Sequence, residues 1–207
     1  MHAAAEGHDD VVRLLLRNPL IQLNAKDKAG FTPLSWAAYS GNAATVRLLL
    51  DSGKVGIDTK DNVGHTPLTL AAIGGDEEVF QLLLDTGECD LNAESVNDQT
   101  ILVRAAREGH LKIVEILLAT NKVDVEARDG HKRTALLAAT CRRHTEVVAC
   151  LLKRGANVDV MDNCGWTPWS FGEDRGYRDI PALLRPHVER IGAGDSKQIR
   201  QVGGAGV

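Results

Sequence analysis

The stretch "GHTPLTLAAIGGDEEVFQLLLDTG", residues 64–87, restates most of the pattern that residues 30–53 already contain. Five copies of this pattern open at Thr32, Thr66, Thr100, Thr134 and Thr167, so successive openings lie 34, 34, 34 and 33 residues apart. A fixed period of this length indicates one supersecondary unit per copy. One such unit cannot bury its apolar side alone, so the copies are expected to stack into a continuous array.

Each copy predicts two helices and a turn. The Thr-Pro pair, as in Thr66-Pro67, supplies an N-cap oxygen and a residue suited to the first helical position. A small pair such as Ala71-Ala72 leaves room for a neighbouring helix. A glycine follows where the first helix must stop, because a left-handed residue is favoured there; these glycines are Gly7, Gly41, Gly75, Gly109 and Gly176. A second apolar stripe predicts the second helix.

Composition narrows the class of protein. Hydrophobic residues make up 43% of the 207 residues and charged residues 25%, which is typical of a folded globular chain. No apolar run is long enough to span a bilayer, and no secretion signal opens the chain. We therefore expect a soluble intracellular protein, in the cytoplasm or the nucleus. The four cysteines lack CxxC spacing, so reduced thiols without a metal are expected, and no cofactor.

The charge distribution argues against nucleic acid as a partner. Residues 65–98 contain eight acidic residues and no Lys or Arg, whereas residues 99–154 contain eleven basic and six acidic residues. An acidic block beside the basic one would repel phosphates.

These motifs resemble the ankyrin repeat family, whose pattern D-x-x-G-x-T-P-L, A-A-x-x-G-H, V-x-x-L-L and G-A-x-V-N/D recurs from residue 3 to about residue 185. The resemblance implies an all-α solenoid of stacked helix-turn-helix units with hairpin-like tips and about five and a half repeats. The pair Ser35-Trp36 and the 34-residue period further resemble the C-terminal ankyrin arrays of fungal proteins, including NLR-like proteins.

The repeat boundaries follow from this pattern. We expect a partial first repeat at 1–30, full repeats at 31–64, 65–98, 99–132 and 133–165, a C-terminal capping repeat at 166–191 and a flexible tail at 192–207. Because the first copy lacks its Thr-Pro half, the first complete helix pair is expected to expose one apolar flank. The chain is accordingly predicted to be a monomer or a fragment of a longer protein.

In ankyrin proteins a partner binds in a groove formed by the tips and the exposed side of each first helix. Carried over position by position, the resemblance implies a binding groove whose chemistry varies from copy to copy while the frame does not. Its predicted residues are Phe31, Tyr39, His65, Ile73, Gln99, Arg107, Glu108, Arg133, Cys141, Arg142 and Trp166. Protein–protein recognition is the function predicted first, with another protein as the partner.

The alternative is a small-molecule-binding or catalytic ankyrin protein that uses the same groove for acid–base chemistry. No nucleophile elbow, metal motif or phosphate loop appears, so no catalytic residue is assigned. If the groove were catalytic, Glu108, His65 and Asp98 would be the candidates.

Four residues depart from the repeat. Asp98 and Lys132 replace the glycine of the tip, Arg143 replaces the glycine that ends the first helix, and Arg104 stands where other copies have Trp36, Leu70, Ala138 and Phe171. Drift in a tolerant scaffold explains such changes, and a basic cluster that contacts a ligand is the alternative.

Overall fold

The computed structural model describes residues 1–189, and the tail expected at 192–207 lies outside the described residues. The helices are α1 (His2–Ala5), α2 (Asp9–Leu16), α3 (Pro33–Tyr39), α4 (Ala43–Asp51), α5 (Pro67–Gly74), α6 (Glu77–Asp85), the 3-10 turn η1 (Val96–Asp98), α7 (Ile101–Glu108), α8 (Leu111–Ala119), α9 (Ala135–Cys141), α10 (Thr145–Lys153) and α11 (Pro168–Asp174). Residues 179–189 are also helical.

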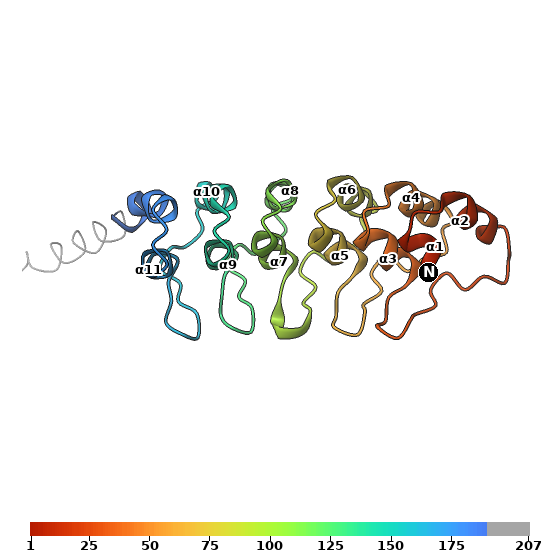
Figure 1. Ribbon diagram of the computed structural model, residues 1–207, viewed down its shortest axis with the longest axis horizontal. Helices are drawn as coiled ribbons and strands as arrows, with labels where there is room; N and C mark the ends of the chain where they lie inside the picture. The colour runs from red at the N-terminus through yellow and green to blue at the C-terminus, as the bar shows by residue number, and fades with distance from the viewer. Residues whose placement is uncertain (190–207) are drawn as a thin grey trace, which may run out of the picture.

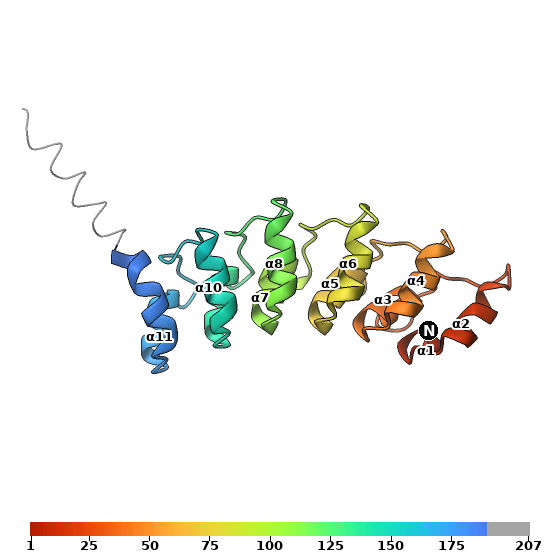
Figure 2. The same cartoon turned by 90° about the horizontal axis from the view of Figure 1, so that it is seen from above.

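The helices form two rows. Figure 1 shows an inner row, α3, α5, α7, α9 and α11, with the loop tips hanging beside it, and an outer row, α2, α4, α6, α8 and α10, on the far side from the tips. Figure 2 shows the same helix pairs standing one after another in a single line. Residues 1–189 form no named strand, so the predicted all-helical solenoid is confirmed.

The threonine at the start of each copy caps its inner helix. The Thr66 side-chain oxygen accepts a hydrogen bond from the backbone N–H of Thr69 at 3.2 Å, and Thr32, Thr100, Thr134 and Thr167 each cap the residue three positions on in the same way. Such a cap satisfies one of the backbone donors left free at a helix start. The capping role predicted for these threonines is confirmed.

The inner helices end on left-handed residues. Gly75 and Gly109 have φ of 79° and 84° at the C-caps of α5 and α7. Arg143 keeps this conformation without glycine, at φ 59°, and the tip substitutes Asp98 and Lys132 do likewise at 53° and 60°. The backbone path is therefore retained at all three departures from the repeat.

Lys132 offers a direct measure of this strain. We expect Lys132→Gly to raise the free energy of unfolding by about 0.5–1 kcal/mol, because a left-handed conformation costs a residue with a Cβ about 1–2 kcal/mol and glycine gives part of that back in unfolded-state entropy. Urea denaturation of the two proteins tests this. Equal stability would mean that the turn tolerates Lys132 without strain.

Several outer helices begin with a polar residue that forms hydrogen bonds to the preceding copy. The His110 Nε2 atom donates to the Ile73 carbonyl at 3.1 Å, and the His144 Nε2 atom donates to the Arg107 carbonyl at 3.0 Å. Each carbonyl lies in the last turn of the inner helix of the preceding copy, Ile73 in α5 and Arg107 in α7, where it has no partner within that helix. Asn42 makes the equivalent contacts to the carbonyls of Ala4 and Ala5.

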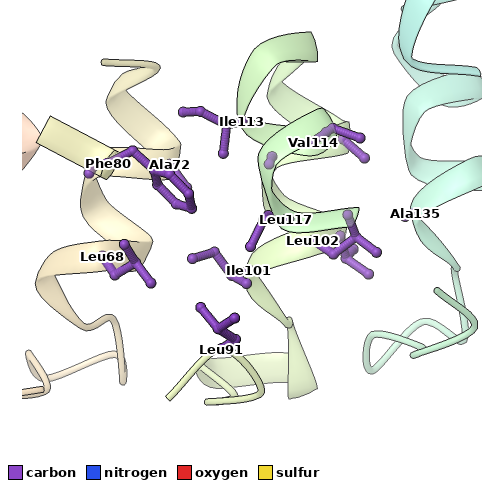
Figure 3. Packing of buried hydrophobic residues seen from close by; sticks show 14 of the residues in the cluster. Leu68, Ala72, Phe80, Leu91, Ile101, Leu102, Ile113, Val114, Leu117 and Ala135 are labelled. Carbon is purple, nitrogen blue, oxygen red and sulfur yellow. The ribbon is translucent and has the colours of Figure 1, made fainter. Parts of the chain in front are cut away.

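The core runs along the line between successive helix pairs. Figure 3 shows Phe80 and Ala72 on the side of their helix pair that faces Ile113 of the next pair. Within that next pair, Val114 and Leu102 lie on the side away from Phe80, toward Ala135. Phe80 is the largest side chain that is completely buried. Each copy therefore uses both of its sides for packing, as the repeat predicts.

The first copy presents the same positions to solvent. Val11 is 47% exposed and Leu15 39%, whereas Val79 and Leu83, which occupy the equivalent places two copies later, are fully buried. The exposed apolar surface thus belongs to the partial copy. The prediction that the first complete helix pair exposes its flank is wrong, because α1 and α2 pack against α3 and α4 and leave Leu34, Val46 and Leu49 buried. Among residues 1–189, no helix is both long enough and apolar enough to cross a membrane.

The tips are closed by an aspartate. The Asp61 Oδ1 atom accepts hydrogen bonds from the backbone N–H groups of Val63 and His65, and Asp27, Asp129 and Asp162 repeat this arrangement. Successive tips also join by backbone hydrogen bonds, such as that from Val96 N–H to the Val63 carbonyl at 2.8 Å. In the tip before Thr100, Ser95 takes the aspartate position and pairs with Gln99.

Candidate binding groove

We call one side of the array the groove face. In each copy it comprises the residue before the capping threonine, the fourth residue after that threonine, and the two residues that follow the small pair. The second oxygen of the tip aspartate holds some of these side chains. Asp27 Oδ2 accepts from Trp36 Nε1 at 2.8 Å, Asp61 Oδ2 contacts His65 Nδ1 at 3.2 Å, and Asp129 Oδ2 accepts from Arg133 Nη2 at 2.8 Å. The tips thus orient the groove face.

The groove face begins with an aromatic cluster in the second repeat. The ring centroids of Phe31 and Trp36 lie 4.8 Å apart, and Tyr39 meets both rings edge-on at 6.4 and 6.5 Å. The hydrogen bond from Trp36 lowers the pKa of Asp27, and backbone N–H groups act in the same direction. Tyr39 is 45% exposed, so this cluster offers an apolar surface with a polar rim to a partner.

A polar chain occupies the middle of the groove face. Arg104 Nη2 lies 3.3 Å from His65 Nε2, and Arg104 Nη1 lies 3.7 Å from Glu108 Oε1. His65 and Arg104 are 39 positions apart in the chain and belong to neighbouring copies. Together with the contact between His65 and Asp61, this chain links a tip to the next inner helix.

The far end of the groove face is aromatic and basic. Trp166 and Phe171 pack edge-on with their centroids 5.9 Å apart, and the Arg175 guanidinium lies over the Phe171 ring at 5.2 Å. A guanidinium over an aromatic face is favourable and is common in binding surfaces. Cys141 lies near Arg133 and Arg175, whose charges act on its thiol.

The predicted groove residues differ in how far they are exposed. Tyr39 and Arg142 are exposed, and seven others are half-buried: Phe31, Ile73, Arg107, Glu108, Arg133, Cys141 and Trp166. Gln99 and His65 are buried, with 7% and 9% of their surface exposed. Gln99 closes its tip through its backbone carbonyl, and His65 is held between Asp61 and Arg104. The place of these two residues in a binding groove stays a prediction.

The three candidates of the catalytic alternative, Glu108, His65 and Asp98, do not form one hydrogen-bonded group within residues 1–189, and this alternative stays a hypothesis. Both ring nitrogens of His65 are engaged by protein atoms, and Asp98 lies exposed on a tip with no hydrogen bond to His65 or Glu108 within the described residues. A general base must reach the proton it removes. Residues 1–189 also contain no cluster of three or more side chains suited to hold a metal ion.

The thiols are poorly suited to nucleophilic chemistry. Burial raises the pKa of Cys89 to about 11, and burial likewise raises the pKa of Cys141 on the groove face. The thiolate is the reactive form, so a raised pKa lowers reactivity at neutral pH. All four cysteines are free, as expected.

The residues predicted for the groove do not include the fourth residue after each threonine. Trp36, Arg104 and Phe171 occupy this position, and each contacts a predicted groove residue. The alignment of the copies shows a position that changes from Trp to Leu, Arg, Ala and Phe, and this variation is the signal that could have identified it.

The two rows of stacked helix pairs with tips on one side define a helical repeat solenoid. A family model described as ankyrin repeats (three copies) matches residues 1–60, 54–129 and 102–191. The chain belongs to the ankyrin repeat family. Ankyrin repeats are a common protein-interaction module.

Solved structures agree with this assignment. An ankyrin repeat domain from Acinetobacter baumannii AYE is 30% identical, with a TM-score of 0.76 and coverage of 88% of this chain and 94% of that one. The ankyrin repeat protein EF0377 is 25% identical, with a TM-score of 0.80 and coverage of 89% and 94%. No curated protein matches the chain. These names say nothing of fungal or NLR-like proteins, so that narrower resemblance stays a prediction.

Proposed function

We propose that this array recognises a partner protein through its groove face. The observation that carries the proposal is the aromatic cluster of Phe31, Trp36 and Tyr39, in which Tyr39 is 45% exposed and Trp36 is held by the tip residue Asp27. Aromatic residues and arginine dominate the binding energy of protein interfaces. The rigid helix pairs behind the groove face reduce the entropy that binding would otherwise cost.

Electrostatics favours a partner with acidic groups. Arg107 and Arg142 make no ion pair within the described residues, so their charges are available to a ligand. Four of the eight acidic residues at positions 65–98, Asp76, Glu77, Glu78 and Asp85, belong to α6 or its cap in the outer row. They therefore do not line the groove face. Charges on the groove face would steer a complementary partner.

The test is capture of partner proteins from a lysate by the wild type and by the double variant Tyr39→Glu with Arg142→Glu. Both side chains are exposed, and neither makes a hydrogen bond within residues 1–189, so the fold should persist. Tyr39→Glu should weaken binding because it places a charge in an apolar contact, and Arg142→Glu should weaken it because it replaces an attractive charge by a repulsive one. We expect at least a roughly tenfold loss of retained partner.

Lys153→Glu is the matched control, because Lys153 is exposed on α10 in the outer row. It should retain the same proteins as the wild type, as judged by quantitative mass spectrometry. Equal capture by the wild type and the groove variant would show that the groove face is not the binding surface.

A further inference from the structure

Arg104 is a charged residue in a row that is otherwise apolar. The equivalent residues of the other copies are Trp36, Leu70, Ala138 and Phe171. Leu70 is 2% exposed and packs within the fold, so the scaffold does not need a charge at this position. Four other copies accept an uncharged side chain at this position. A reason for the charge must therefore lie outside the packing of the array.

The Arg104 guanidinium is incompletely paired. It carries five N–H donors, yet it makes one hydrogen bond to His65 and one longer contact, 3.7 Å, to Glu108. Its Nε atom is buried and has no hydrogen-bond partner within the described residues. Burial lowers the pKa of Arg104, and the charge of Arg107 lowers it further. The surroundings of Arg104 thus disfavour the charged form of its guanidinium, and an anion bound beside it would stabilise that charge.

His65 fixes the guanidinium in place. A guanidinium only donates hydrogen bonds, so His65 Nε2 must be the acceptor and His65 Nδ1 must carry the hydrogen. Nδ1 then donates to Asp61 Oδ2 at 3.2 Å, and Asp61 is anchored by two backbone N–H groups of its tip. The chain from Asp61 through His65 to Arg104 therefore holds the guanidinium before any ligand binds.

We propose that Arg104, flanked by Arg107 and Arg142, binds a carboxylate of an acidic, extended segment of the partner protein. This inference rests on the proposed function and names the chemistry of its partner. Three arginines against Glu108 leave two positive charges on this part of the groove face. Arg133 is not part of the acceptor set, because Asp129 already takes two of its donors at 2.8 and 3.0 Å.

An extended segment suits the layout better than a single small anion. The arginines belong to successive inner helices, Arg104 and Arg107 to α7 and Arg142 to the C-cap of α9. The aromatic cluster of α3 lies at one end of the same face, and Trp166 with Phe171 lies at the other. A segment with a central acidic stretch and apolar residues toward its ends would match this order.

The experiment begins by panning a displayed library of randomised twelve-residue peptides against the whole chain. Enriched peptides are then measured by fluorescence anisotropy with the wild type, Arg104→Leu and Arg104→Lys. We expect enrichment of Asp and Glu, and a loss of affinity of about 10- to 100-fold in Arg104→Leu, the range for a hydrogen bond to a charged group. Arg104→Lys should fall between, because lysine keeps the charge but lacks the planar fork.

Two controls separate binding from folding. Arg104→Leu copies the residue that the preceding repeat carries at Leu70 but leaves His65 Nε2 without its donor, so a modest fall in melting temperature is expected. Circular dichroism must show that the variant is folded at the temperature of the binding measurement. Arg47→Leu removes the same charge from the outer helix α4, where the side chain is 54% exposed, and it should leave affinity within about twofold. A Glu→Gln change in the peptide should weaken binding to the wild type but not weaken it further in Arg104→Leu.

The inference and the proposed function fail in different ways. The inference would be overturned by enriched peptides that lack acidic residues, or by peptides that bind Arg104→Leu as tightly as the wild type. If such peptides fail to bind the Tyr39→Glu, Arg142→Glu variant, the groove face would still be the binding surface. No enrichment, or a twenty-nucleotide single-stranded DNA that binds more tightly than every peptide, would also overturn the inference. The proposed function would then be judged by partner capture alone.

Discussion

Gly75→Ala is expected to lower the free energy of unfolding by about 2–5 kcal/mol. Gly75 has φ of 79°, where a residue with a Cβ costs about 1–2 kcal/mol. The added Cβ would also overlap the ring atoms of His110, which would have to move and release the Ile73 carbonyl. A buried acceptor left without its partner costs a further 1–3 kcal/mol or so.

Gly53→Ala is the matched control for this prediction. Gly53 also has a positive φ, 62°, but a Cβ built there meets nothing within 4 Å. It should therefore show only the backbone cost of about 1–2 kcal/mol. Urea denaturation followed by circular dichroism measures both variants. In a His110→Ala background, Gly75→Ala should cost less than in the wild type; an unchanged cost would mean that His110 is not the source of the extra penalty.

The local rules of the repeat could be read from the sequence. The threonine caps and the left-handed glycines depend on interactions within about five residues, and the sequence predicts both. Periodicity extended these rules along the chain. At Arg143 and Lys132 the backbone is left-handed without glycine, so it follows the path of the repeat rather than the preference of the residue.

Contacts between copies could not be predicted in this way. The contact of Arg104 with His65 spans 39 positions, and that of His144 with the Arg107 carbonyl spans 37. Both depend on which side chain of one copy reaches its neighbour, which a residue alignment does not encode. For the same reason the sequence did not show that His65 is buried, or that α6 carries much of the acidic block to the outer row.

Phe80→Ala is expected to lower the free energy of unfolding by about 3–5 kcal/mol, the usual cost of removing a buried aromatic ring. Phe80 is completely buried and lies on the side of α6 that faces the next helix pair, beside Ala72 and toward Ile113. The cavity would sit between the third and fourth copies, and each copy of a solenoid contacts only its neighbours. Loss of this interface should therefore separate the array into two parts that unfold less cooperatively.

Phe80→Val is the matched control, because valine occupies the same place in four other copies: Val12, Val46, Val114 and Val148. A frame that already accepts valine at this position should lose less than half as much stability as with alanine. Urea denaturation read by circular dichroism, together with hydrogen exchange resolved by segment, distinguishes the outcomes. Phe80→Ala should accelerate exchange on both sides of the interface, in α6 and α8, before α10. Uniform exchange along the array would show instead that the solenoid unfolds as one cooperative unit, and the groove face would then depend on every interface between its copies rather than on the nearest ones.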